Sequence, residues 1–421
     1  MSIPALMPGA LTPDRPLRLV GPDHAPRLAT TRAGPAMAQS AAGAWQAVAA
    51  NTPRFHGSAR RLLVEAARSN LLRNPRGEGG AAGTPGTLPT YYGVVGTSVG
   101  LNRSILGTGS EDGVPYVEIR LSGTPSSTTS YRLGFETGTG GAPAAQGQAW
   151  LLSVFLRLTG GTVPAAGGPL LGLQERDAGG GSLGSPILSA SLPVGSGPLA
   201  SQRFALAASL TQASTTALTA ELRFPLQSGV PVDFTYRIGA PQLELGRNAS
   251  SLILPAAGTP ATSSRAADQL VWAPPGGFGP QGTLVVQAML PQTALFGEHQ
   301  GLFQLDDGSD TNRILLRNTS GGATLFGVVD SGGATLAAIS GGNVTAGTSF
   351  RAALAWAPGD QALCLNGGTV QTAAVALPTG LTRLLVGQGS TLLNRAANGE
   401  IAVLDYRPTR LSNAMLQALT V

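Results

Sequence analysis

The sequence predicts an all-β protein, with an extended N-terminal arm followed by two antiparallel β-sandwich domains of the jelly-roll or lectin-like type. Glycine, at 59 residues, and proline, at 31, are too frequent for a helical protein. The sequence has no Gly-X-Y period, which excludes a collagen triple helix. Short apolar runs of strand length lie between turn-forming residues, as in a chain of many short strands. A length of 421 residues gives room for two or three such domains.

Residues 1–76 are predicted to form a basic, extended docking arm. They hold ten Arg against three acidic residues, a net charge of +7, whereas residues 77–421 carry −2. Residues 1–50 are rich in Pro and Ala and lack periodicity, which is typical of a segment that becomes ordered on a partner. The arginines are dispersed and no aromatic platform accompanies them, which favours an acidic protein surface over nucleic acid as the partner.

Residues 77–247 are predicted to form the first sandwich, beginning with a Gly-rich link. Apolar and charged residues alternate in Tyr116–Leu121, as on a half-buried strand. Trp150–Leu158 is more uniformly apolar, as in a strand of a sandwich core. The other expected strands are Tyr131–Glu136, Leu170–Gln174, Arg203–Leu210, Ala217–Phe224 and Phe234–Leu245.

A linker at residues 248–267, rich in Ser, Ala, Pro and Thr, is predicted to precede the second sandwich at residues 268–421. Leu411–Leu419 is expected to form a short terminal helix with Ser412 as its N-cap. No repeat with a fixed period of 20–50 residues is present, which argues against a solenoid or propeller. The strands expected in this domain are Thr283–Met289, Gly301–Leu305, Arg313–Asn318, Ala323–Val329, Ser349–Trp356, Gln361–Leu365, Arg383–Val386 and Gly399–Arg407.

Three groups of short segments share a pattern with one class of virion protein. Asn51-Thr-Pro-Arg-Phe55 and the following Leu62–Leu72 resemble a segment near the start of tailed-bacteriophage appendage proteins. Ala240–Gly246, continued through Ser264–Asp268, resembles the join between their sandwich domains. Asn398–Tyr406, with Leu411-Ser412 and Leu416–Thr420, resembles the closing strand and tail of a concanavalin A-like lectin sandwich.

The resemblance implies a virion structural protein, a head spike or tail fibre, made in the cytoplasm of a bacterial host. Its partners would be other virion proteins, reached through the N-terminal arm, and further copies of itself in a homo-oligomer. The resemblance also favours extended chain at residues 59–72, although Leu62, Leu63, Ala66 and Leu71 fit a helical stripe as well.

The implied activity is host attachment through carbohydrate binding, in which weak contacts are multiplied over many copies. Two alternatives remain open: a purely structural head or neck decoration without a ligand, and a polysaccharide depolymerase. Tyr91 and Tyr92 follow a Gly-, Pro- and Thr-rich stretch, and they are the candidates for stacking on a glycan. Trp150 and Trp356 lie within expected strands and are interpreted as core residues.

We expect no enzymatic activity. A chain without lysine cannot provide a Walker A lysine or a Schiff base. Gly-x-Ser-x-Gly occurs at residues 96–100 and 180–184, but neither match precedes a helical pattern, so turns are expected there instead of nucleophile elbows. Glu400 and Asp405 are the best pair of carboxylates for glycoside hydrolysis, and their spacing on one strand predicts opposite faces.

No cofactor or metal is predicted. Asp306–Asn312 is the densest cluster of oxygen ligands, with Asp307, Asp310 and Asn312 as calcium candidates. The cluster lacks the closing Glu of an EF-hand, and its composition favours a hairpin turn. The three His are scattered and Cys364 is the single Cys, so neither a zinc site nor an intrachain disulfide is expected. No apolar run reaches the length of a membrane span, and no signal peptide is recognisable at the start of the sequence.

Overall fold

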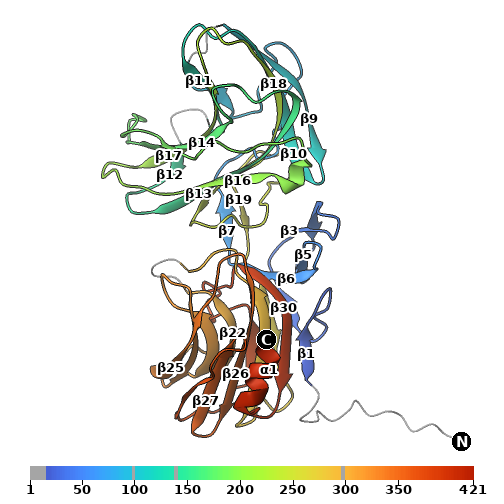
Figure 1. The fold of residues 1–421 in the computed structure, drawn as a ribbon, viewed down its shortest axis with the longest axis vertical. Helices are drawn as coiled ribbons and strands as arrows, with labels where there is room; N and C mark the ends of the chain where they lie inside the picture. Colours follow the sequence, from blue (N-terminus) through green and yellow to red (C-terminus); the bar gives the residue numbers. More distant parts are fainter. Residues whose placement is uncertain (1–15, 97–99, 137–140, 295–298) are drawn as a thin grey trace, which may run out of the picture. The chain divides into compact units, whose positions relative to one another are not determined.

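The computed structural model describes residues 16–96, 100–136, 141–294 and 299–421. Nearly all of its regular structure consists of antiparallel strands, which confirms the all-β prediction (Figure 1). The chain divides into two compact units. We call residues 42–47 and 68–265 the inserted unit. The discontinuous unit contains the chain up to residue 41, residues 48–67 and residues 266–421.

The inserted unit has a five-stranded and a six-stranded sheet around one hydrophobic core. Phe224 lies at the centre of this core, with ring centroids 5.4 Å from Phe234 and 5.3 Å from Tyr236. Every strand expected in this domain is found. The first sheet has the order β16 (Arg203–Ser209), β13 (Ala149–Gly161), β18 (Val232–Leu245), β10 (Val114–Gly123) and β9 (Leu101–Glu111). The second has the order β15 (Ile187–Leu188), β14 (Leu170–Arg176), β17 (Ala217–Leu226), β11 (Thr129–Gly134) and β8 (Gly93–Val94), with β12 (Ala142–Pro143) on β17.

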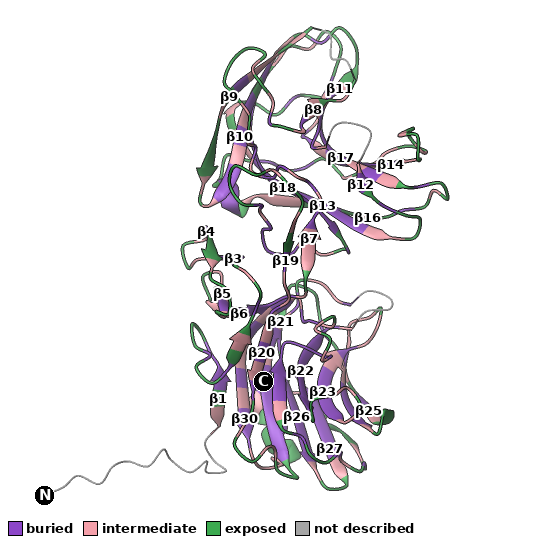
Figure 2. Cartoon of the chain, turned by 180° about the vertical axis from the view of Figure 1, so that it is seen from behind, coloured by how far each residue is buried: buried purple, intermediate pink, exposed green. Residues whose placement is uncertain are grey.

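The discontinuous unit is a second sandwich, and its strands β22, β23 and β26 are largely buried (Figure 2). All eight strands expected in residues 268–421 are confirmed. One sheet has the order β28 (Gln371–Ala373), β27 (Asp360–Leu365), β26 (Ser349–Ala357), β21 (Gly282–Met289), β30 (Gly399–Arg407), β6 (Arg61–Val64) and β5 (Arg54–His56), with β1 (Leu17–Val20) on β30. The other has the order β2 (Ala29–Thr31), β20 (Gln269–Trp272), β29 (Arg383–Val386), β22 (Gly301–Asp306), β23 (Arg313–Asn318), β24 (Thr324–Ser331) and β25 (Ala334–Asn343).

The terminal helix α1 (Asn413–Thr420) matches its prediction. Ser412 is the N-cap, and its side chain accepts a hydrogen bond from the backbone nitrogen of Met415. Leu416 is fully buried in a small cluster with Val285, Ala353 and Cys364. The helix therefore covers the outer face of the eight-stranded sheet.

The expected extended arm is wrong for residues 16–76, because these residues are built into the two units. In the discontinuous unit, β1 and β6 pair with β30, and β2 pairs with β20. Leu19, Val20, Leu62 and Val64 are fully buried in the core of that unit. Each of these strands is only three or four residues long, so it has too few apolar positions to show a period. Two further short strands of this segment are β3 (Ala36–Gln39) and β4 (Trp45–Val48).

The extended interpretation of residues 59–72 is confirmed by β6 and by β7 (Arg68–Asn70). The expected linker at residues 248–267 is only partly correct. Ser251, Leu252 and Ile253 are buried, and β19 (Ser263–Arg265) pairs with β7 inside the inserted unit. The exposed residues of this segment are 256–259, 261, 262 and 264.

Candidate functional site

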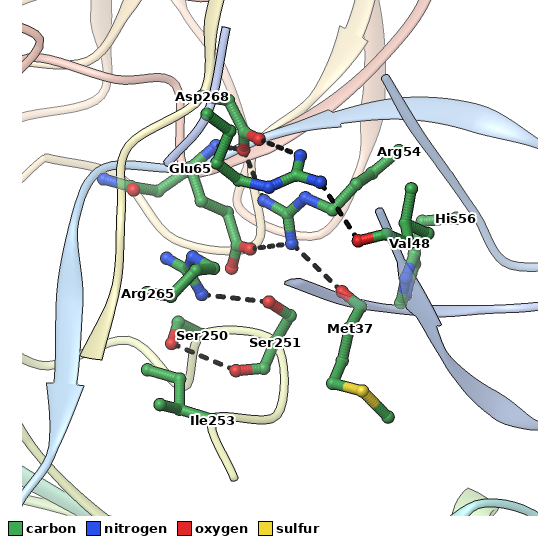
Figure 3. Close-up of polar contacts among 12 residues, drawn as sticks. Met37, Val48, Arg54, His56, Glu65, Ser250, Ser251, Ile253, Arg265 and Asp268 are labelled. Carbon is green, nitrogen blue, oxygen red and sulfur yellow. Dashed lines mark hydrogen bonds and ion pairs between the residues drawn. The ribbon is translucent and has the colours of Figure 1, made fainter. Parts of the chain in front are cut away.

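Four charged side chains form a buried cluster in the discontinuous unit, which we call the clasp: Arg32, Arg54, Glu65 and Asp268. Figure 3 labels the last three. Arg32 Nη1 lies 2.8 Å from Asp268 Oδ1, and Arg54 Nη1 lies 2.7 Å from Glu65 Oε2. Arg54 Nη2 also binds Asp268, which in addition accepts a hydrogen bond of 2.9 Å from the backbone nitrogen of Glu65. The exposed fraction of each side chain is at most 6%.

The clasp is assembled where several strands begin or end. Arg32 follows β2, Arg54 opens β5, Glu65 follows β6 and Asp268 precedes β20. Burial lowers the pKa of Arg54, but its two carboxylate partners outweigh burial and raise the pKa above its ordinary value. Since the two positive and two negative charges balance, the clasp is a structural feature that carries no free charge for a ligand.

Four other arginines of the expected arm have acidic partners within their own unit, and Arg68 and Arg76 bind backbone carbonyls. Asp405 binds Arg18, Asp23 binds Arg60, Glu400 binds Arg61, and Glu136 binds Arg73. Asp268, Asp405, Glu400 and Glu136, which lie outside residues 1–76, therefore balance four of the seven excess positive charges of this segment. The arginines that form these ion pairs are therefore not free to bind an acidic surface on another subunit.

The two tyrosines predicted to meet a glycan have different environments in the inserted unit. Tyr92 is buried, donates a 3.1 Å hydrogen bond to the carbonyl of Asn74 and packs edge-on against Phe135, so it is a core residue and not an exposed platform. Tyr91 is half-buried, and the guanidinium of Arg73 covers its ring at 3.5 Å from the centroid. The ring face that Arg73 covers is not open to a sugar.

A polar groove of 480 Å³ lies in the inserted unit and is lined by Glu136, Arg176, Thr219 and Glu221 together with five glycines. Its volume falls within the roughly 300–1,000 Å³ typical of ligand sites. Arg73 holds Glu136 through contacts of 2.9 and 2.6 Å, while Arg132 holds Glu221 through contacts of 2.9 and 3.2 Å. The groove therefore presents oriented polar groups beside bare glycine backbone. Tyr91 is connected to it through Arg73 and Glu136.

The acidic loop between β22 and β23 is the hairpin turn that its composition predicts. Asp307 accepts hydrogen bonds from the backbone and hydroxyl of Ser309 and from the side chain of Asn312. Asp310 instead binds Gln304, Ser390 and the backbone nitrogen of Thr391. These hydrogen bonds lower the pKa of Asp307.

The calcium candidates Asp307, Asp310 and Asn312 therefore have protein partners and do not converge on one point. In the described part of the chain, no group of three or more His, Cys, Asp or Glu side chains is placed to hold a metal ion.

Next to this loop, the outer face of the seven-stranded sheet carries a buried ionic network. Arg313 Nε lies 2.7 Å from Asp330 Oδ2, and Arg383 binds Asp306. Gln304 donates hydrogen bonds of 2.9 Å to both Asp306 and Asp310. Arginines thus occupy the positions next to these carboxylates that a cation would otherwise need to fill.

The catalytic candidates do not form a site. Ser98 of the first Gly-x-Ser-x-Gly lies outside the described residues, and Ser182 of the second lies beyond β14 and accepts a 2.8 Å hydrogen bond from Arg176.

Glu400 and Asp405 lie on the same face of β30, contrary to the prediction. A β-bulge beside Ile401 shifts the register, so that Ile401 and Leu404 both face the core. At about 3.3 Å per residue the two carboxylates are roughly 16 Å apart along the strand, beyond the ~5–9.5 Å of a glycosidase pair.

An apolar pocket of 370 Å³ opens in the discontinuous unit between Phe278, Trp356, Pro358, Leu377 and Leu381. Trp356 is 1% exposed and Trp150 is 2% exposed, which confirms both as core residues. Among the described residues, no helix combines the length and the apolar character needed to cross a bilayer.

No protein-family model matches the chain, and no curated protein matches its sequence significantly. One similar solved structure is the CBM40 domain of the Ruminococcus gnavus IT-sialidase bound to α2,3-sialyllactose, at 18% identity over 34% of this chain and 84% of that chain, with a TM-score of 0.29. Another is mouse laminin α1 domains LG4-5, at 10% identity over 66% of this chain and 91% of that chain, with a TM-score of 0.25. Likenesses at these TM-scores carry no argument about function.

Proposed function

We propose that this protein is a virion structural appendage of a tailed phage or phage-like particle, a head spike or tail fibre, whose sandwiches attach to host-surface glycans. The observation that carries the proposal is the clasp. Arg54 belongs to the NTPRF-like segment, Glu65 to the segment after it, and Asp268 to the segment that resembles the domain join. Asp268 is 214 residues from Arg54 and 236 from Arg32 in sequence, yet it binds both.

Buried ionic clusters are costly to form, so their residues must be present together. Three degenerate matches arising by chance would have no reason to meet in one such cluster. Their convergence supports reading the matched segments as parts of one structural feature, which strengthens the resemblance to phage appendage proteins.

The groove of the inserted unit is the proposed glycan site. Its carboxylates are fixed by arginines, and Arg176 is held by Thr219 Oγ1 at 3.3 Å and by the carbonyl of Gly180 at 3.2 Å. Oriented donors and acceptors over an open glycine floor suit the hydroxyl groups of a sugar. Many copies on one particle would turn weak contacts into firm attachment.

Two experiments test the proposal. Mass spectrometry of purified particles should detect the protein at a fixed copy number, and absence from particles would overturn the virion role. Binding of host-surface polysaccharide should weaken in Arg176→Gln but not in the control Arg120→Gln, which removes an exposed charge from the same unit.

If no polysaccharide binds, the protein is a structural decoration. Release of reducing ends would instead identify a depolymerase.

Residues 16–76 belong to the two units. Of the segment expected to dock on the particle, residues 1–15 are therefore the part that we propose as the attachment segment. Particles made with a protein lacking residues 1–15 should contain fewer copies of it. A normal copy number would place the anchor in the sandwiches.

A further inference from the structure

We propose that Arg317 and Arg395, with His299, form a subsite of the discontinuous unit that binds the carboxylate of an acidic sugar residue such as a hexuronate. The inference rests on the proposed glycan binding and adds a second contact point with a defined ligand class.

The first step is the position of the two arginines. On β23, Ile314 and Leu316 belong to the core, so Arg317 projects from the outer face of the sheet, as Arg313 does. The register partner of Arg317 is Gly301 on β22. The backbone nitrogen of Gly301 donates a 2.9 Å hydrogen bond to the carbonyl of Arg395, which ties the loop carrying Arg395 to this end of the sheet.

This approach of the loop depends on a glycine at position 301. A Cβ atom there would lie 2.0 Å from the backbone nitrogen of Gly389, whose N–H also bonds the carbonyl of Arg395 at 3.0 Å. The local backbone is therefore arranged so that the loop can pack directly onto β22. Arg395 is held beside the end of β23 as a consequence.

The second step is the lack of a compensating carboxylate. Asp330 is bound by Arg313 and by Thr335 Oγ1, while Asp306 and Asp310 are bound within the ionic network described above. Within the described ranges, neither Arg317 nor Arg395 forms an ion pair with an acidic side chain, whereas Arg313 and Arg383 on the same sheet do. The Nε–H of Arg317 is buried and has no acceptor.

His299 completes the subsite as a neutral side chain. Arg317 Nη1 lies 2.5 Å from His299 Nδ1. A guanidinium can only donate, so the contact with Arg317 fits a neutral ring with an unprotonated Nδ1, whereas the carbonyl of Asn318, 3.2 Å from the same nitrogen, can only accept. Burial, together with the charge of Arg317, lowers the pKa of His299 and favours this neutral form.

The third step is electrostatic. Burial and repulsion by Arg395 and Arg313 lower the pKa of Arg317, with Asp330 giving a partial offset. A bound anion beside the two guanidinium groups would relieve this repulsion. A carboxylate fits because its two oxygens match the planar edge of a guanidinium. A neutral sugar provides no such charge.

The test uses the full-length protein and a matched pair of ligands: a short oligogalacturonate and its fully methyl-esterified form, which has the same sugars without the charge. Isothermal titration calorimetry should show binding of the acid that weakens with added salt. The ester should bind at least roughly 10-fold more weakly, as for loss of a charged hydrogen bond. Equal binding of acid and ester would overturn the proposal.

Arg317→Gln and Arg395→Gln should each weaken binding of the acid by roughly 10- to 100-fold. The control Arg351→Gln removes an exposed charge from β26, on the other sheet of the same unit, and should leave affinity unchanged. Unaltered affinity in Arg317→Gln would exclude the subsite.

Thermal melting provides a check on folding. Because Arg317 lacks a carboxylate partner among the described residues, Arg317→Gln should melt no lower than wild type, and only wild type should gain stability from the oligogalacturonate.

The outcomes also separate the two proposals. If neutral host glycan still binds in an Arg176-dependent manner while oligogalacturonate does not bind, the subsite fails and the proposed function stands. If neither ligand binds, the subsite and the glycan-binding part of the proposed function both fail.

Discussion

Replacing Asp268 with Asn should strongly destabilise the discontinuous unit. The substitution keeps the size and shape of the side chain but removes the negative charge that Arg32 and Arg54 share. Glu65 would then be the single carboxylate facing two buried guanidinium groups. In addition, an amide has one acceptor oxygen, whereas Asp268 accepts hydrogen bonds on both oxygens, from both arginines and the backbone nitrogen of Glu65.

The magnitude follows from the burial of the clasp. Asp268 is 2% exposed and both arginine side chains are 0% exposed, so water cannot take over the lost charge. Removing one partner of such a pair costs about 3–5 kcal/mol. For a unit of roughly 200 residues, 1 kcal/mol shifts Tm by about 2–4 °C, so a fall of roughly 6–20 °C is expected.

Differential scanning calorimetry measures the change, and hydrogen exchange shows where it acts. Faster exchange should appear in β6 and β20, which flank Glu65 and Asp268. Asp23→Asn is the matched control, since Asp23 pairs with Arg60 in the same unit but is 57% exposed. It should cost less than about 1 kcal/mol. Equal losses in the two variants would refute the reasoning from burial.

Three further predictions concern the discontinuous unit. Deleting residues 1–15 should leave Tm unchanged. Deleting residues 1–50 removes β1, β2 and Arg32, so it should lower both Tm and solubility. Equal melting curves for the two deletions would contradict the strand assignments. Asp307→Ala should change the free energy of unfolding by less than about 0.5 kcal/mol. Asp310→Ala should cost about 1–3 kcal/mol, because Asp310 accepts a hydrogen bond from the backbone nitrogen of Thr391. A calcium-dependent rise in Tm that either substitution abolishes would reinstate a metal site. Burial lowers the pKa of His56, and its Nδ1 accepts a hydrogen bond from the backbone nitrogen of Gln39. As the pH falls, the His56 side chain is therefore protonated in the unfolded chain, near pH 6.5, before it is protonated in the folded chain. The free energy of unfolding should consequently decrease as the pH drops from 7.5 to 5.5. This fall should be smaller in His56→Gln by calorimetry, and an identical pH profile would count against a neutral His56.

The long strands were predictable because each carries its own pattern. Trp150–Leu158 and Arg313–Asn318 have enough apolar residues to be recognised locally, and Ser412 has the chemistry of a helix cap. β9 and β25 were missed because small, polar and glycine residues dominate them. β1, β2 and β6 are short and pair with strands that lie far away in sequence, so no local signal predicts them.

The candidate sites were less predictable because they depend on details outside simple alternation. The turn at residues 306–312 follows from composition, but composition does not tell that Asp310 faces the sheet while Asp307 faces its own loop. A bulge reverses the face of Asp405 relative to Glu400. Whether an arginine such as Arg317 has a carboxylate partner depends on tertiary contacts, which a charge count does not reveal.

The pairing of β1 with β30 bears on how the protein is made. Arg18 and Asp405 are neighbours in the fold but lie 387 residues apart in sequence. At a translation rate of about 5–20 residues per second, β1 waits roughly 20–80 s on the ribosome before its partner strand has been synthesised. The inserted unit lies entirely between them and can fold during that interval. The N-terminal strands β1 and β6 therefore leave the ribosome first, but they pair with β30 last. Nascent chains stalled before residue 399 should expose Leu19 and Leu62 to chaperones.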